Sequence, residues 1–117
     1  MRLERQYLID IIEAADAIAA FLSGQDKQSF LDNDLVRSAV LHKITVIGEA
    51  AGKVTPEFRQ RYSEVRWVDI VAFRNIAVHA YFSVEWSTVW VAATKETVEL
   101  RNKIATILTA EFPDSEA

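Results

Sequence analysis

The sequence has no cysteine and few of the residues that interrupt helices. Its 117 residues include three glycines, two prolines and two histidines. The lack of cysteine excludes disulfides and thiolate metal sites, and two histidines argue against a metal cage built from side chains alone, so we expect no metal and no cofactor. Scarce glycine and proline, with half of the residues hydrophobic, favour a folded and mostly helical chain over a disordered or all-β one.

Long apolar runs and a targeting segment are also missing. No run of apolar residues is long enough for a membrane span, which needs about 18 or more. The apolar run at the N-terminus contains acidic residues and lacks a small-residue cleavage site, which is unlike a secretion signal. We therefore expect a cytoplasmic protein without a membrane partner.

Positive charge is not in excess over the whole chain. The net charge of −4 argues against a protein that coats nucleic acid non-specifically. The charge is uneven, however, because residues 37–74 hold seven Lys or Arg against four Asp or Glu. This asymmetry permits a local contact with a polyanion and does not require one.

Apolar residues recur at helical spacing along most of the chain, which predicts an all-α, up-and-down antiparallel bundle of four long helices and a short helical turn. We expect one domain over residues 1–112, a frayed tail at 113–117 and a loop at 23–29. The short turn should follow Thr55-Pro56, a capping residue and a proline suited to a first helical turn. The long helices are predicted from about Leu3 to Ser23-Gly24, from Asp32 or Asp34 to Gly52, from Arg66 to His79 or Ala80, and from Ser83 to about Ala110.

The third predicted helix is apolar nearly all round and should be the most buried element. It nevertheless contains Arg74 and His79, five positions apart, and Tyr81 follows at once. Burying an unpaired charge costs several kcal/mol, so these groups need partners or a task. On an unbroken helix Arg74 and His79 lie about 140° apart. They converge only if the helix ends or distorts near His79, or if a two-fold dimer supplies a second copy.

Such groups suit the cleavage of RNA without a metal. This reaction needs a base for the ribose 2′-hydroxyl, a cation for the charge on the phosphorus centre and an acid for the departing 5′ oxygen. Histidine titrates near neutrality, so His79 can be the base or the acid. Arg74 stays protonated and presents a forked set of donors to phosphate oxygens, and Asn75 beside it can orient the phosphate or the imidazole.

A purely structural interpretation of these residues stays open. Arg74 would then form an ion pair with Asp69 or Glu85, and His79 would end its helix by bonding free carbonyls. Tyr81 would be a core aromatic residue whose hydroxyl reaches the surface. Spacing alone does not separate this interpretation from the catalytic one.

Other cationic and aromatic residues have two interpretations each. Arg59, Arg61 and Arg66 either bind an RNA backbone or are ordinary solvated charges. Trp86 and Trp90 are one helical turn apart, which is typical of core or interface packing rather than base stacking.

The stretch IGEAAGK, residues 47–53, lacks the glycine spacing of a phosphate-binding loop. We expect Gly48, Ala50 and Ala51 to allow a close helix crossing, and Glu49 to hold a cation such as Arg74 or to mark a cleft wall. His42, among apolar neighbours on the same helix, is expected at the boundary of the core.

The sequence resembles the HepT family of HEPN-domain proteins, the toxin halves of bacterial toxin–antitoxin pairs whose antitoxin is a minimal nucleotidyltransferase. The resemblance covers most of the chain, from the first helix to the start of the last. The residues that carry it are Tyr7, Asp10-Ile11, Phe21, Phe30, the IGEA stretch at 47–50, Trp67, Ile70, Arg74-Asn75, His79, Tyr81 and Phe82.

The resemblance implies a helical homodimer in which both motifs face a shared cleft, and an activity similar to that of metal-independent endoribonucleases. It implies that Arg74 and His79 are catalytic, with Asn75 as a helper. It also implies that the partner nucleotidyltransferase attaches AMP to Tyr81 and so silences the toxin. The alternative hypothesis is a non-catalytic module that docks the nucleotidyltransferase or binds a nucleotide.

Overall fold

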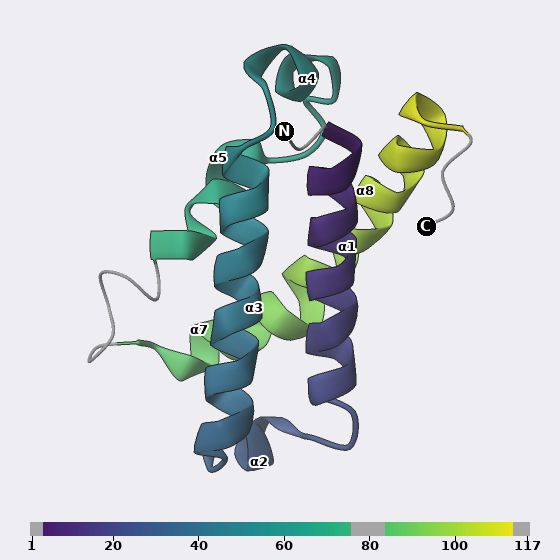
Figure 1. Cartoon of the computed structure of the whole chain (residues 1–117). Coiled ribbons are helices and arrows are strands. Elements are labelled where there is room, and N and C mark those ends of the chain that lie inside the picture. The colour runs from purple at the N-terminus through teal and green to yellow at the C-terminus, as the bar shows by residue number, and fades with distance from the viewer. Residues whose placement is uncertain (1–3, 76–83, 114–117) are drawn as a thin grey trace.

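The computed structural model describes residues 4–75 and 84–113, and within these ranges all regular elements are helical. The all-α prediction is thus confirmed (Figure 1). The elements are α1 (Glu4–Phe21), α2 (Lys27–Leu31), α3 (Asp34–Gly52), α4 (Pro56–Arg61), α5 (Trp67–Val71), α7 (Trp86–Val91), a π-helical segment (Ala92–Glu96) and α8 (Thr97–Glu111).

Helices α1 and α3 lie side by side and run in opposite directions, and α8 crosses behind α1 (Figure 1). Each contributes a stripe of aliphatic residues at helical spacing, as the sequence predicts. Burying one Leu or Ile side chain contributes about 1.5–3 kcal/mol, so this shared core dominates the stability. Its fully buried aliphatic members include Leu8, Ile11, Ile18, Val40, Ile44, Ile47, Ile104 and Leu108.

Local capping residues set the starts of three helices. The Asn33 side chain accepts a hydrogen bond from the backbone N–H of Val36, which starts α3. Thr55 accepts from the N–H of Phe58 with Pro56 at the first helical position, so α4 forms where the sequence predicts a short turn.

The expectation of a loop over residues 23–29 is wrong for its last part, where α2 begins. Asp26 accepts a hydrogen bond from the N–H of Ser29 at 2.8 Å, and the Ser29 hydroxyl accepts from the N–H of Asp26 at 2.9 Å. This reciprocal capping box starts a helix that buries Phe30 completely. The signal was present in the sequence as an aspartate and a serine three positions apart.

The predicted fourth helix is divided by the π-helical segment between α7 and α8. The backbone N–H of Thr97 donates to the carbonyl of Ala92, five residues back, which adds a residue to that turn. The extra residue rotates the helix so that Thr97 faces the core at 1% exposure while Val98 is 46% exposed. Helical spacing in the sequence permits either Val98 or Thr97 on the inner side of this helix, and Thr97 is the inner one. Ser83, the predicted cap of this helix, lies outside the described residues.

The predicted third helix differs most from expectation. Helix α5 ends at Val71, Ala72 forms a turn, and residues 73–75 are helical again. Its burial is one-sided, since Trp67, Ile70 and Phe73 are buried while Val68 is 79% exposed. For residues 66–75, the part of the predicted helix that the structure describes, the expectation of burial nearly all round is therefore wrong. The reason is its position at the edge of the fold, where it packs against α3 (Figure 1).

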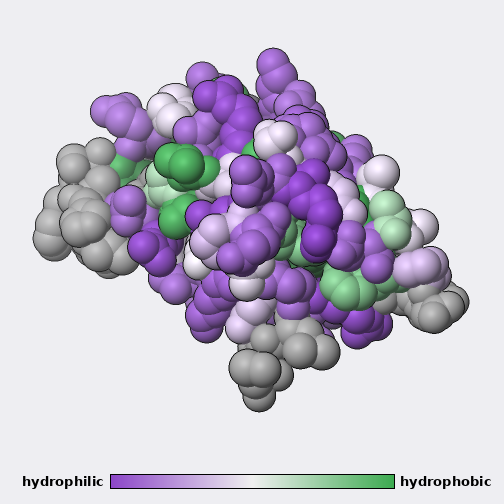
Figure 2. Space-filling view, turned by 90° about the horizontal axis from the view of Figure 1, so that it is seen from above, coloured by the Kyte–Doolittle hydropathy of each residue, from purple (hydrophilic) through white to green (hydrophobic). Residues whose placement is uncertain are grey.

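The surface seen in Figure 2 is mostly hydrophilic, and hydrophobic side chains appear there in small separate groups. Within residues 4–75 and 84–113, none of the helices combines the length and the apolar character that a bilayer crossing demands.

Candidate functional site

Arg74 follows the turn at Ala72 and lies against α3. A Cβ atom built on Gly48 would be 2.6 Å from the backbone nitrogen of Arg74, and one built on Gly52 would be 3.4 Å from its Nη1 atom. The Arg74 main chain therefore rests on Gly48, and its guanidinium lies over the last turn of α3. The expected close helix crossing at Gly48 is present, and α5 with its following turn is the crossing element.

The Arg74 side chain is exposed and has no ion-pair partner among the described residues. Asp69, one of the two partners in the structural interpretation, instead pairs with Arg66, with 2.7 Å between Oδ2 and Nε. Glu85, the other candidate, is exposed and forms no ion pair with a described residue. Glu49, a third candidate, also forms no ion pair with a described residue. Within the described part of the chain, Arg74 thus presents a permanently charged fork of donors that no carboxylate holds.

Asn75 is exposed beside Arg74, and its backbone N–H donates to the carbonyl of Ala72 at 2.9 Å. This bond spans three residues, so it tightens the turn that interrupts the helix just before Arg74. His79 and Tyr81, the other two motif residues, lie outside the described residues.

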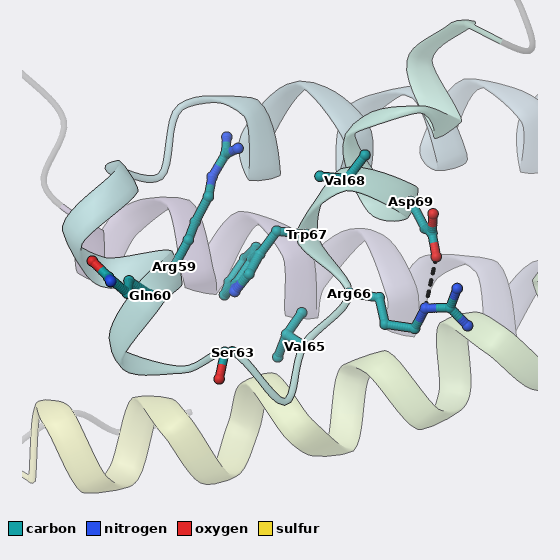
Figure 3. Close-up of a pocket in the computed structure, with 8 residues that line it drawn as sticks. All are labelled: Arg59, Gln60, Ser63, Val65, Arg66, Trp67, Val68 and Asp69. Carbon is teal, nitrogen blue, oxygen red and sulfur yellow. Dashed lines mark ion pairs between the residues drawn. The ribbon is translucent and has the colours of Figure 1, made fainter.

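A pocket of about 480 Å³ lies between α4 and the start of α5 (Figure 3). It brings together two of the three arginines predicted to bind RNA, Arg59 and Arg66, with the Arg66–Asp69 ion pair at its edge. A second cavity, of about 370 Å³, lies beyond this pair and is lined by Glu96, Glu99 and Asp69 together with Arg66 and Lys103, so acidic residues outnumber basic ones there. Repulsion from these carboxylates disfavours an anion there, so the first pocket is the better place for a phosphate.

The three arginines are held in different ways. The Nη2 atom of Arg59 donates to the carbonyl of Ala51 at 2.9 Å and so caps the C-terminal end of α3, while its buried Nε has no partner. Arg61 points away from this pocket and forms an ion pair of 2.7 Å with Glu111 on α8. Arg66 is 82% exposed despite its bond to Asp69. Arg66 is therefore the most accessible of the three.

Tyr62 on the loop after α4 interacts with Glu111 at the end of α8, and this contact changes the pKa of the tyrosine. The Tyr62 hydroxyl donates to Glu111 Oε2 at 2.5 Å. This hydrogen bond, with smaller effects of desolvation and of the carboxylate charge, raises the pKa of Tyr62 above its usual 10.0. The cluster fastens α4 to the end of α8, and its role is structural.

The tryptophans pack as the sequence predicts, whereas His42 does not lie where it was expected. The ring centroids of Trp86 and Trp90 lie 6.3 and 5.3 Å from that of Phe30, so the predicted packing role is confirmed. His42 is exposed on α3 rather than at the core boundary. In the described ranges no three His, Asp or Glu residues are grouped as a metal site would need.

Sequence reasoning missed the part played by Gly52, which it assigned only to the end of α3. The signal was the spacing of four between Gly48 and Gly52, which places both on one face of the helix. It also did not predict that Tyr7 and Asp10 of α1 line a cavity of about 160 Å³ with Glu49 and Lys53 of α3. Glu49 lies in the wall of this cavity, which Arg74 does not line, so its expected place at the wall of the cleft around the motif stays a prediction.

Comparisons with known proteins agree on one family. The family model described as "Ribonuclease HepT-like" matches residues 11–107. A protein of Caldanaerobacter subterraneus named a putative RNase is 29% identical over 95% of this chain and 99% of its own. A Methanocaldococcus jannaschii protein, also named a putative RNase, is 28% identical over 86% of this chain and 92% of its own. The "Probable ribonuclease HepT" of Thermococcus cleftensis is 28% identical over 87% of this chain and 93% of its own. No solved structure matches.

Proposed function

Because the chain belongs to the HepT-like ribonuclease family, we propose that it is an endoribonuclease toxin that cleaves RNA without a metal ion. In this proposal Arg74 holds the scissile phosphate, His79 transfers protons and Asn75 orients the phosphate. The observation that carries the proposal is the state of Arg74, a guanidinium exposed and unpaired among the described residues, in the motif that the resemblance identifies as catalytic.

The proposed reaction is attack by the ribose 2′-oxygen on the adjacent phosphorus. A bond forms between O2′ and phosphorus, and the bond between phosphorus and O5′ breaks. One histidine accepts the 2′-hydroxyl proton, and a second protonated group gives a proton to the departing O5′. The products are a 2′,3′-cyclic phosphate and a 5′-hydroxyl. Arg74 stabilises the charge that builds on the phosphate oxygens in the transition state.

A homodimer would supply the two proton-transfer groups from a single type of residue. Each chain has one motif histidine, His79, and a two-fold axis brings the same patch of both chains together. The shared cleft of the proposed dimer would then hold two copies of Arg74 and His79. One imidazole would serve as base while the other, protonated, serves as acid.

The pocket beside α5 extends the proposed RNA path. Arg66 is exposed, and it lines the pocket together with Arg59, so both can approach phosphates near the cleaved linkage. Arg61 is held by Glu111 on α8, and we leave it out of this path.

We further propose that a partner nucleotidyltransferase neutralises the toxin by attaching AMP to Tyr81. The support is the resemblance of the Arg74–His79–Tyr81 pattern to the family motif. The tyrosine oxygen would attack the α-phosphorus of ATP and release pyrophosphate. The bulky anion, two residues from His79, would then repel the RNA backbone from the site.

Cleavage of an end-labelled RNA in buffer with EDTA tests the proposal. We expect the wild type to cleave and to leave cyclic phosphate ends, while Arg74→Ala and His79→Ala do not. Arg101→Ala is the matched control, because Arg101 is also a surface arginine and pairs with Asp16 on α1, on another element of the fold. Binding of RNA without cleavage would favour the non-catalytic module instead, and cleavage that requires a metal would refute the mechanism.

Incubation with ATP and a minimal nucleotidyltransferase of the kind that the resemblance implies as partner tests the modification. We expect the peptide that contains Tyr81 to gain one AMP and the modified protein to lose cleavage. Tyr81→Phe should keep cleavage and escape silencing. Silencing of the Tyr81→Phe variant, with AMP on another residue, would contradict the assignment.

A further inference from the structure

Gly48 and Gly52 lie on one face of α3, directly beneath Arg74. We call these two residues the glycine face. From their geometry we infer that the glycine face positions the Arg74 guanidinium, so that both glycines are positioning residues of the proposed active site. This inference rests on the proposed role of Arg74 in cleavage and names the part of the fold that sets its geometry.

Gly48 sets the position of the Arg74 main chain. A Cβ atom on Gly48 would lie 2.6 Å from the Arg74 nitrogen, 3.2 Å from the Arg74 Cβ and 3.2 Å from the carbonyl oxygen of Ile70. Nonbonded heavy atoms usually approach to about 3.5–4.0 Å, so no side chain fits there. Because the nearest atom belongs to the main chain, a side-chain rotation cannot relieve the clash. The whole segment that carries Arg74 would have to move away from α3.

Gly52 sets the position of the Arg74 side chain. It lies one turn further along α3, about 6 Å from Gly48 at a rise of about 1.5 Å per residue. The Nη1 atom of Arg74 is 3.4 Å from the Cβ position of Gly52, and the next atom is Val71 Cγ1 at 3.9 Å. The arginine side chain therefore follows the glycine face from one residue to the other. It reaches the C-terminal end of the helix, where the helix dipole favours a cation.

The end of α3 lies against Arg74 without accepting hydrogen bonds from its guanidinium. The carbonyl of Ala51 already accepts a hydrogen bond from Arg59, and the carbonyl of Ala50 accepts one from the N–H of Lys53. Among the described residues the Arg74 guanidinium has no such bond. It is thus kept near its place by shape and by the helix dipole, and its fork stays available for a phosphate. Such preorganisation reduces the entropy lost when substrate binds.

Backbone conformation does not explain either glycine. In the described part of the chain only Gly24 has a positive φ, so Gly48 and Gly52 adopt angles open to any residue. Glycine is also the least favourable residue after proline inside a helix. At Gly48 the cause that remains is the space that the Arg74 segment occupies, whereas at Gly52 a Cβ would be in ordinary contact with the guanidinium and only a larger side chain would displace it.

Gly52→Leu is the sharpest test, because the new Cβ would contact only the far end of the Arg74 side chain and one methyl group of Val71. Leucine also has the better helix propensity, so the fold should be retained. We expect kcat for RNA cleavage to fall by about tenfold or more with a smaller change in KM, as for an interaction made mainly in the transition state. Ser38→Leu places the same leucine side chain at an exposed position of α3 and should cleave like the wild type.

A double variant separates positioning from a general structural effect. If Gly52 acts through Arg74, Gly52→Leu should cause no further loss of residual cleavage in an Arg74→Ala background. A further loss of similar size there would overturn the inference. So would wild-type kcat in Gly52→Leu when Arg74→Ala abolishes cleavage, whereas a wild-type protein that never cleaves would refute only the proposed function.

Nuclear magnetic resonance of the arginine side chains tests the same inference without RNA. The Nε–H signal of Arg74 can be assigned by its loss in Arg74→Lys. We expect this signal to shift and to show greater mobility in Gly52→Leu and in Gly48→Ala, and to stay unchanged in Ser38→Leu. An unchanged Arg74 signal in both glycine variants would overturn the inference whatever the activity.

Discussion

Replacing Arg74 with alanine should separate catalysis from stability. The side chain is exposed and has no ion-pair partner among the described residues, so its removal deletes no buried contact there. Surface substitutions of this kind usually change the free energy of unfolding by less than about 0.5 kcal/mol. The interaction of the guanidinium with the end of α3 adds about 0.3–1 kcal/mol. We therefore expect a destabilisation of about 1 kcal/mol or less.

Catalysis should respond far more strongly to the same change. Removing one preorganised donor to a developing oxyanion typically lowers kcat by about 10²–10³ fold, or about 2.7–4 kcal/mol. Arg74→Ala should therefore lose at least this factor in RNA cleavage. The structural interpretation predicts the reverse, since breaking a buried ion pair costs about 3–5 kcal/mol of stability.

Urea denaturation beside the cleavage assay measures both quantities, with Arg66→Ala for comparison. The Arg66–Asp69 pair has side chains that are 82% and 55% exposed, so its loss should cost about 1 kcal/mol or less. The two arginine variants should thus unfold at similar urea concentrations and differ in cleavage. An Arg74→Ala protein destabilised by about 3 kcal/mol, or one that cleaves at the wild-type rate, would refute the reasoning.

Two further predictions rest on the fold, and a third rests on the proposed homodimer. Phe30→Ala should lower the free energy of unfolding by about 3–5 kcal/mol in urea, because Phe30 is fully buried against Trp86 and Trp90, and a loss below about 1 kcal/mol would contradict that packing. The raised pKa of Tyr62 means that the bond to Glu111 stabilises the fold below about pH 10 and is lost as pH rises through the higher folded pKa. Ultraviolet titration of phenolate should show one late-titrating tyrosine that disappears in Tyr62→Phe, and equal titration of both proteins would contradict it. Light scattering should give twice the 13.2 kDa chain mass, and a monomer at the concentrations that support cleavage would exclude the shared cleft.

Local sequence was sufficient for the elements whose stability is local. The caps at Asn33 and Thr55 satisfy backbone groups within three residues, so the starts of α3 and α4 follow from neighbouring positions. The same holds for the Asp26 capping box, which sequence reasoning overlooked. The apolar periodicity of α1 and α3 likewise indicated most of the core positions, although Leu35 at the start of α3 is 80% exposed.

The apolar periodicity did not predict the two places where a helix departs from regular geometry. The interruption at Ala72 and the π-helical segment before Thr97 each change the helical phase, and no glycine or proline marks either one. They arise where a helix must fit neighbouring elements, so only the packed chain reveals that Val68 and Val98 face outward.

Some features of the candidate site also follow from the sequence, while others depend on tertiary packing. The residue types of the motif and its resemblance to a ribonuclease family were determined by the sequence, because chemistry and family patterns are carried by residue identity and order. The tertiary structure alone decided that Arg61 pairs with Glu111 and that Arg74 lies on Gly48 and Gly52. Those contacts join segments that are distant in the chain, and they depend on how closely two backbones approach. The spacing of residues within one helix does not predict that distance.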